Sequence, residues 1–210
     1  MPAVAPVWSW SGFYVGGHAG YGWGRPDIVD AVTNVTAGNK PQLSGFLGGV
    51  QAGYLWQRDR WVYGLEGDFT WADVSATSNL SIPSGIINTK IVAQEFATFT
   101  ARVGWADGRF LYYVKGGGAM VYEKYTQLSV TTPICTGRAC TGNDDNWGWT
   151  ASAGVEYAID PRWSVRAEYS YLDFGRGEKV RISNGASFSN FNITNRFDLF
   201  KVGVNCKIGG

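Results

Sequence analysis

Apolar and polar residues alternate along several stretches of this chain. In residues 13–23, aromatic or small apolar side chains occupy the odd positions, and glycines and one histidine occupy most of the even positions. A period of two is typical of a β-strand, whose side chains point alternately to opposite faces. The pattern predicts eight strands, at 13–23, 46–56, 61–71, 97–105, 110–122, 147–157, 163–171 and 200–208.

The connections between these stretches alternate between short and long. Three are tight turns near Arg58, Gly108 and Pro161, and the others are 24–44, 72–92, 124–146 and 175–195. Short turns at one end and long loops at the other are typical of outer-membrane barrels. We therefore predict an all-β fold, an eight-stranded antiparallel up-and-down transmembrane β-barrel over 12–210, preceded by a periplasmic N-terminal segment, 1–11.

Alternation alone would also fit a soluble barrel, which turns its apolar face inward. Two observations favour a membrane barrel. Charged residues make up only 17% of the chain, below the roughly 25% of an average soluble domain. Aromatic residues lie near both ends of the apolar face, as expected for two interfacial belts. The predicted belts contain Trp23, Trp56, Trp61, Trp71, Trp105, Trp147, Trp149 and Trp163.

Location and partners follow from this topology. Short turns face the periplasm in such barrels, so we expect a bacterial outer-membrane protein with both termini in the periplasm. Outer-membrane lipid and lipopolysaccharide are the expected partners of a monomer, and peptidoglycan is a candidate partner on the N-terminal side. A net charge of +1 gives no basis for binding nucleic acid. Residues 1–7 lack the features of a signal peptide, which we expect in the natural precursor.

Several short motifs follow one another in a fairly specific order. They are WSGFYVGG (10–17), AGYGW (19–23), GVQAGY (49–54), ARVGW (101–105), GVEY (154–157) and RAEY (166–169). Their order and spacing resemble the small alphaproteobacterial outer-membrane proteins known as porin-family surface antigens. The resemblance implies an OmpA-type transmembrane barrel that supports envelope integrity, and some members of this family bind haem. The ending VNCKIGG (204–210) lacks the aromatic last residue usual in the family.

Inward-facing positions, counted from the short turns, include charged residues of both signs. Side chains just fill the interior of an eight-stranded barrel, and buried opposite charges should pair. The predicted lumen ion-pair network contains Glu66, Arg102, Lys115, Glu156, Arg166, Glu168 and Lys201. Our first hypothesis is a structural barrel, plugged by these pairs, that supports envelope integrity and presents extracellular loops. The alternative is a narrow porin-like channel for ions or small solutes.

The remaining candidate residues give no catalytic or metal site. His18, the only histidine, lies mid-strand on the inward face, and we expect a hydrogen-bonded lumen residue and no enzyme. Cys135 and Cys140 lie in one long loop, where a disulfide is expected. A zinc site is disfavoured because no histidine lies nearby. Cys206 should face lipid.

A third hypothesis is a haem-binding or adhesion surface formed by the outer loops. Aromatic and sulfur-containing side chains near the third long loop could contact a planar ligand; these are Met120, Tyr122 and Tyr125. Aromatic residues at a membrane rim are expected in any case. We therefore predict no cofactor and keep haem as an alternative.

Overall fold

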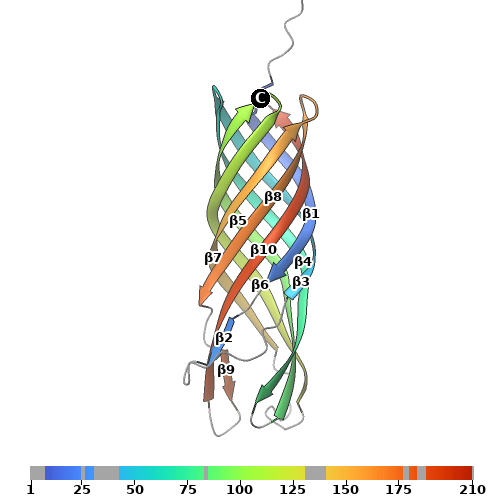
Figure 1. Ribbon diagram of the computed structural model, residues 1–210, viewed down its shortest axis with the longest axis vertical. Helices are drawn as coiled ribbons and strands as arrows, with labels where there is room; N and C mark the ends of the chain where they lie inside the picture. Colours follow the sequence, from blue (N-terminus) through green and yellow to red (C-terminus); the bar gives the residue numbers. More distant parts are fainter. Residues whose placement is uncertain are drawn as a thin grey trace, which may run out of the picture.

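A closed barrel makes up most of the computed structural model, which describes residues 8–24, 27–30, 43–82, 85–130, 141–176, 180–183 and 188–209. Its strands are β1 (Gly12–Gly24), β3 (Leu43–Arg58), β4 (Trp61–Ile82), β5 (Gly85–Asp107), β6 (Phe110–Val130), β7 (Thr141–Ala158), β8 (Trp163–Arg176) and β10 (Phe188–Gly209). Each pairs with its neighbour in this order, and β10 closes the barrel on β1 (Figure 1). The predicted eight-stranded antiparallel fold is confirmed.

Two short strands lie beside the first half of β10. They are β2 (Asp27–Asp30) and β9 (Val180–Ser183), and both pair with β10 in antiparallel fashion. In the described residues no helix is long and apolar enough to cross a bilayer.

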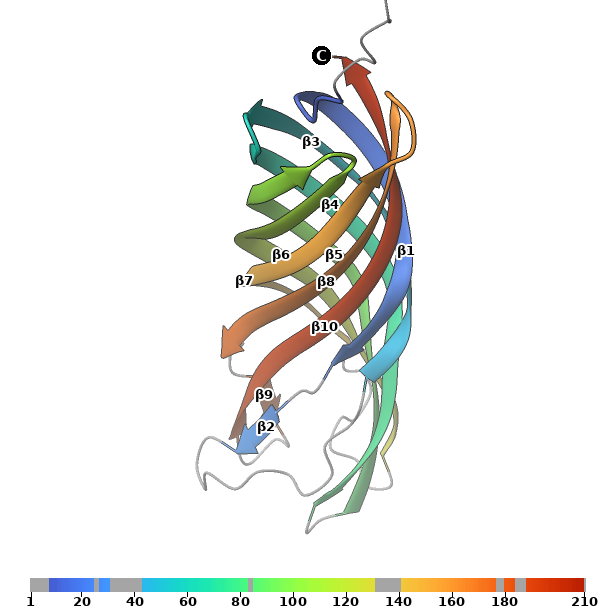
Figure 2. The ribbon, with the colours of Figure 1, turned by 45° about the horizontal axis from the view of Figure 1, so that its top comes forward.

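The barrel has two different ends. The tight turns after β3, β5 and β7 lie at the end where β10 finishes, which we call the turn end; the opposite end is the loop end (Figure 1). Asp59 and Gly108 have φ angles of 56° and 60°, the left-handed conformation that tight hairpin turns need. The strands tilt strongly around the barrel axis (Figure 2), as closure of a barrel requires.

The strands extend farther at the loop end than the sequence pattern predicted. β4 and β5 stay paired as far as Ile82 and Gly85, so the predicted loop 72–92 is wrong. Strand also occupies parts of 24–44, 124–146 and 175–195. Apolar alternation fades there because it is needed only where one face meets lipid. The backbone ladder can continue without it, and the β-branched residues of 86–92 favour strand.

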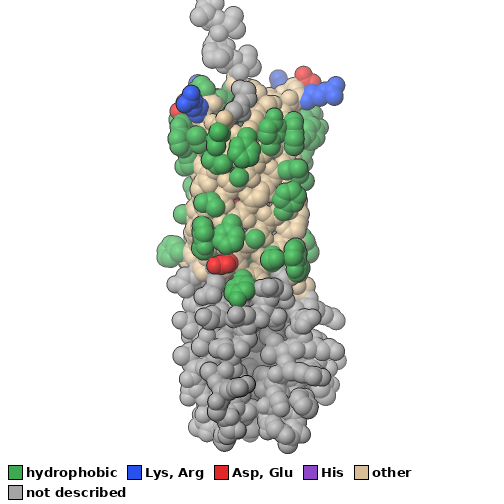
Figure 3. All heavy atoms as spheres, turned by 180° about the vertical axis from the view of Figure 1, so that it is seen from behind, with side chains coloured by type: hydrophobic (Ala, Val, Ile, Leu, Met, Phe, Trp, Pro, Cys, Tyr) green, Lys and Arg blue, Asp and Glu red, His purple; other side chains and the backbone are tan. Residues whose placement is uncertain are grey.

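The side chains described, those of 8–24, 44–72, 95–122, 147–175 and 196–208, follow the predicted faces. On the face seen in Figure 3, hydrophobic side chains are spread over the outside of the barrel, and Lys and Arg lie at the turn end. Phe46 and Trp147, at 78% and 72% exposure, are among the most exposed of these. All the predicted belt tryptophans lie on the outer face, seven exposed and Trp23 half-buried.

Two adjacent glycines of β6 give a test of these faces. A Cβ on Gly117 would overlap the carbonyl oxygen of Phe99, whereas a Cβ on Gly118 would meet nothing within 4 Å. We expect Gly117→Ala to destabilise the barrel by about 1–3 kcal/mol, because neighbouring backbone must shift. Gly118→Ala should change stability by less than about 0.5 kcal/mol. Urea unfolding of protein refolded into lipid vesicles measures both, and equal effects would contradict the assigned faces.

Candidate functional site

The inside of the barrel is filled by three layers of side chains. A central polar network is covered at each end by apolar side chains. The turn layer consists of Trp10, Tyr14, Leu55, Val62, Ala106, Leu111, Tyr113 and Ala158. The loop layer consists of Leu47, Phe96, Ala119, Val121, Leu172, Phe174, Phe197 and Leu199.

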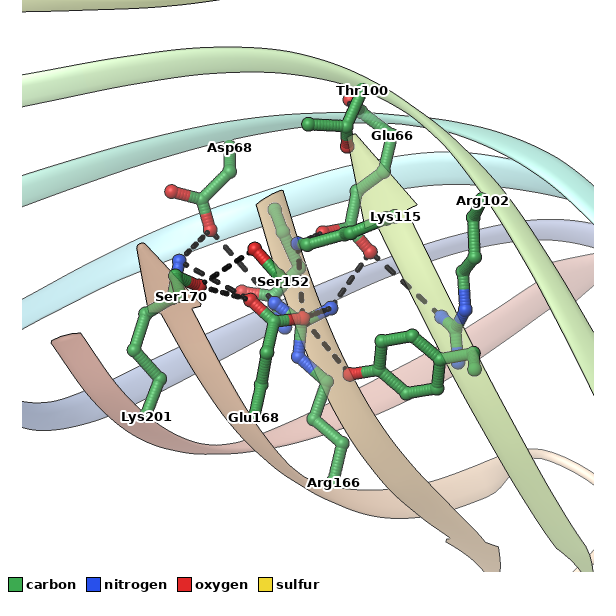
Figure 4. A network of polar contacts seen from close by, with 12 residues as sticks. Glu66, Asp68, Thr100, Arg102, Lys115, Ser152, Arg166, Glu168, Ser170 and Lys201 are labelled. Carbon is green, nitrogen blue, oxygen red and sulfur yellow. Dashed lines mark hydrogen bonds and ion pairs between the residues drawn. The ribbon is translucent and has the colours of Figure 1, made fainter. Parts of the chain in front are cut away.

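Glu66, on β4, is the hub of the central network (Figure 4). It is 1% exposed and receives hydrogen bonds from Lys115 Nζ at 2.5 Å and Arg166 Nη1 at 2.7 Å. Tyr14 donates its hydroxyl to the same carboxylate at 2.5 Å. Arg102 Nη1 lies 3.9 Å away. One carboxylate on β4 thus connects side chains from four other strands.

Glu168, on β8, connects the hub to the remaining cations. Lys115 Nζ lies 3.0 Å from one of its oxygens, and Lys201 Nζ lies 3.6 Å from the other. Tyr113 donates its hydroxyl to Glu168 at 2.9 Å. Lys115 therefore bridges two buried carboxylates, and the network continues from β6 to β10.

Glu156, on β7, occupies the part of the network nearest the turn layer. It accepts hydrogen bonds from Arg102 Nη2 at 2.6 Å, Ser164 Oγ at 2.5 Å and Asn205 Nδ2 at 2.8 Å. The Arg102 guanidinium also stacks on the Tyr113 ring, 3.5 Å from the ring centroid. Such stacking stabilises a desolvated cation.

His18 and Asp68 extend the network to β1 and β3. His18 Nδ1 lies 2.7 Å from Gln51 Oε1, and His18 Nε2 lies 3.0 Å from Thr70 Oγ1. Asp68 lies 3.1 Å from Lys201 Nζ and 3.5 Å from His18. His18 is therefore a hydrogen-bonded lumen residue, as the sequence predicted, and all eight barrel strands contribute to the network.

The charges in this network balance. Four carboxylates, those of Glu66, Asp68, Glu156 and Glu168, face four cations, Arg102, Lys115, Arg166 and Lys201, and all eight residues are buried. Buried ions require this pairing because each unpaired charge would carry a large desolvation cost. When His18 is uncharged, the network carries no net charge and needs no additional ion.

All seven predicted lumen residues meet in this network, but the prediction missed other members. Asp68 lies two residues from Glu66 and so shares its inward face. Tyr14 and Tyr113 donate to Glu66 and Glu168; the alternation places both on the inward face, but it does not show which carboxylate each one contacts.

The sequence prediction also missed both apolar layers. The loop layer could have been found by stepping two residues at a time along each strand, from Lys201 to Leu199 and Phe197. The turn layer includes Trp10, which lies in the predicted N-terminal segment 1–11. Residues 8–11 pack against the barrel, and Trp10 is 4% exposed.

Little empty space is left between these layers. A cavity of about 20 Å³ lies beside Trp10 and Asn205, and one of about 10 Å³ lies beside Thr98 and Lys201. Each has room for about one water molecule. A larger hollow of about 760 Å³ lies on the lipid-facing surface. It is lined mostly by outward-facing residues such as Val50 and Ala52, and its lining also includes Gln51 and Asp68 of the network.

The structure describes only some of the cysteines and of the residues considered for haem binding. Cys135 and Cys140, the predicted disulfide pair, lie outside the described residues. Cys206 is a half-buried free thiol on the lipid-facing surface. Met120 and Tyr122 are described at the loop end, but the side chain of Tyr125 is not.

Comparisons with known proteins agree with this architecture. The model of the outer membrane protein beta-barrel domain family matches residues 1–207. The 31 kDa outer-membrane immunogenic protein of Brucella melitensis is 34% identical over 224 residues, which cover 98% of this chain and 88% of that protein.

Solved structures show the same fold. The outer membrane protein OprG from Pseudomonas aeruginosa has a TM-score of 0.57 at 16% identity, covering 95% of this chain and 97% of that chain. Neisserial surface protein A has a TM-score of 0.51 at 16% identity, covering 94% and 98%. The resemblance noted in the sequence is confirmed: the chain belongs to the outer membrane protein beta-barrel domain family and is an outer-membrane barrel homologous to outer-membrane immunogenic proteins.

Proposed function

We propose that this protein is a closed structural barrel, which supports the integrity of the outer membrane and presents its long connections at the cell surface. The observation that carries this proposal is the filled lumen. A charge-balanced network is covered by an apolar layer on each side, so its charges compensate one another. An ion would have to displace these pairs and both layers to pass.

The proposed orientation places the turn end, with both termini, in the periplasm. Three tight turns at one end support it, and at the other end the chain between consecutive barrel strands is longer at 25–42, 131–140 and 177–187. The turns carry exposed Arg58, Arg60, Arg109 and Arg162, which can contact anionic phospholipid headgroups. Peptidoglycan, if bound, would meet this same rim.

The remaining partner proposals concern the outer surface. The belts of exposed tryptophans support direct contact with lipid around a monomer, and the loop end would lie among lipopolysaccharide. No nucleic acid is proposed as a partner, in keeping with the net charge of +1.

We propose no cofactor and no catalytic role for the lumen. Both ring nitrogens of His18 have side-chain partners, which leaves neither ready for haem iron. The buried carboxylates are paired with cations, and Glu66 also accepts the Tyr14 hydroxyl. A general base must reach its substrate, and these groups face only one another.

Planar-bilayer recording tests the proposal. Refolded protein, with folding verified by heat-shifted gel mobility, should give no discrete conductance steps, because the layers and ion pairs block the lumen. A general porin inserted in the same bilayer serves as the positive control. Reproducible steps whose size changes in Lys115→Met would contradict the proposal and favour the channel.

A further inference from the structure

Residues 8–11 fold back across the turn end of the barrel. Trp10 is buried among the side chains of the turn layer, including Tyr14 and Leu55. Trp8 packs edge-on against Trp10, with ring centroids 5.3 Å apart. These two indoles cover the mouth of the lumen at this end.

Few polar contacts hold these residues in place. The backbone amide of Trp10 donates to Gln57 Oε1 at 2.7 Å, and the backbone amide of Gln57 donates to Ser11 Oγ at 2.9 Å. The exposed ammonium of Lys207 donates to the Ser9 carbonyl at 3.0 Å. A barrel strand, by contrast, is paired with a neighbour on each side along its length.

A glycine with a positive φ lies directly after this segment, at the point where pairing with β3 begins. Gly12, the first residue of β1, has a φ of 134°, a conformation that only glycine adopts readily. The pairing of β1 with β10 also shifts register between Phe13 and Tyr14. The chain therefore changes direction where the segment joins the barrel.

The indole N–H groups of half-buried Trp8 and buried Trp10 have no partner among the described protein atoms. Only water can satisfy them. The cavity of about 20 Å³ beside them reaches Glu156, Ser164 and Asn205. The polar side chains of these three residues therefore lie just inside the mouth of the lumen, where entering water would hydrate them.

We propose that residues 8–11 form a hinged stopper of the turn end. Rotation about Gly12 withdraws Trp10 and admits water as far as Glu156, while the loop layer stays closed. In the open state the lumen is open to water at the turn end and closed at the loop end. The barrel therefore does not conduct ions in either state.

Thiol accessibility tests whether Trp10 seals the mouth. Ser164→Cys, in a background with Cys135, Cys140 and Cys206 changed to Ser, places a thiol beside the cavity. Trp10→Gly should raise its rate of reaction with a water-soluble methanethiosulfonate at least about tenfold, because the rate follows the exposed population. Gln57→Leu keeps Trp10 but removes the side-chain oxygen that accepts its backbone amide. This change should raise the rate of thiol reaction by less than Trp10→Gly does.

Thr150→Cys in the same background is the matched control, since Thr150 is buried on the loop side of the network. Its thiol should react at the same rate with and without Trp10. Folding of each variant is verified by gel mobility. If the Ser164→Cys thiol reacted at equal rates with Trp10 and with Trp10→Gly, Trp10 would not seal the mouth and the proposal would be overturned.

Hydrogen exchange of the unaltered protein tests the hinge independently of any variant. The backbone amides of Trp10 and Gln57 should exchange at the same rate. Both should exchange faster than the backbone amide of Val155, which lies in a strand paired on both sides. Protection equal to that of Val155 would overturn the hinge and leave a fixed cap.

Discussion

Glu66→Gln is expected to lower the free energy of unfolding by about 3–5 kcal/mol, the cost of removing one partner from a buried ion pair. The side chain keeps its size, but Lys115 and Arg166 lose the carboxylate that they contact at 2.5 and 2.7 Å. Both cations are buried and cannot be rehydrated without opening the barrel. Urea unfolding of protein refolded into vesicles, followed by gel mobility and tryptophan fluorescence, measures the change.

Asp107→Asn provides a control at an exposed turn residue and should change stability by less than about 0.5 kcal/mol. The double variant Glu66→Gln/Lys115→Gln should be more stable than Glu66→Gln alone, because it removes one of the uncompensated cations. A Glu66→Gln effect as small as that of Asp107→Asn would show that the network does not hold the barrel together.

The sequence predicted the strands and their faces because lipid imposes a strict rule. Every second residue between the belts must be apolar or small, so Phe99 and Trp61 identify the outer face without any knowledge of packing. The rule ends where the membrane ends, and for that reason it missed the paired extension of β4 and β5 to Ile82 and Gly85.

The identity of the charged lumen residues could be predicted, but their pairing could not. Glu66 and Arg166 are 100 residues apart, and they meet because of the tilt and stagger of the strands around the barrel. These quantities are set by barrel closure as a whole and leave no trace in local alternation. Trp10 was missed for another reason, since β1 begins only at Gly12 and the period of two does not extend before it.

The loop layer was missed because its inward residues are apolar, as are many outward residues of the same strands. Phe96 is inward and buried, and Phe99, three residues farther along β5, is outward. Composition cannot separate the two, although the alternation can. The contrast between them provides the second large prediction.

Phe96→Ala is expected to lower the free energy of unfolding by about 3–5 kcal/mol, the sum of a transfer cost and the cost of a cavity. Phe96 is 1% exposed and contacts Phe197 and Phe174, with ring centroids 5.1 and 6.3 Å away. The layer is held between the barrel walls and the central network, so it cannot collapse into the space.

Phe99→Ala is the matched control, because it makes the same chemical change on the same strand at a side chain that is 64% exposed toward lipid. Acyl chains can fill the space that it leaves, so only the transfer cost of about 1.5–3 kcal/mol remains. Urea unfolding in vesicles compares the two variants. If Phe99→Ala destabilised the barrel as much as Phe96→Ala, the loop layer would not be a packed core. The seal proposed at that end would then rest on the ion pairs of the central network alone.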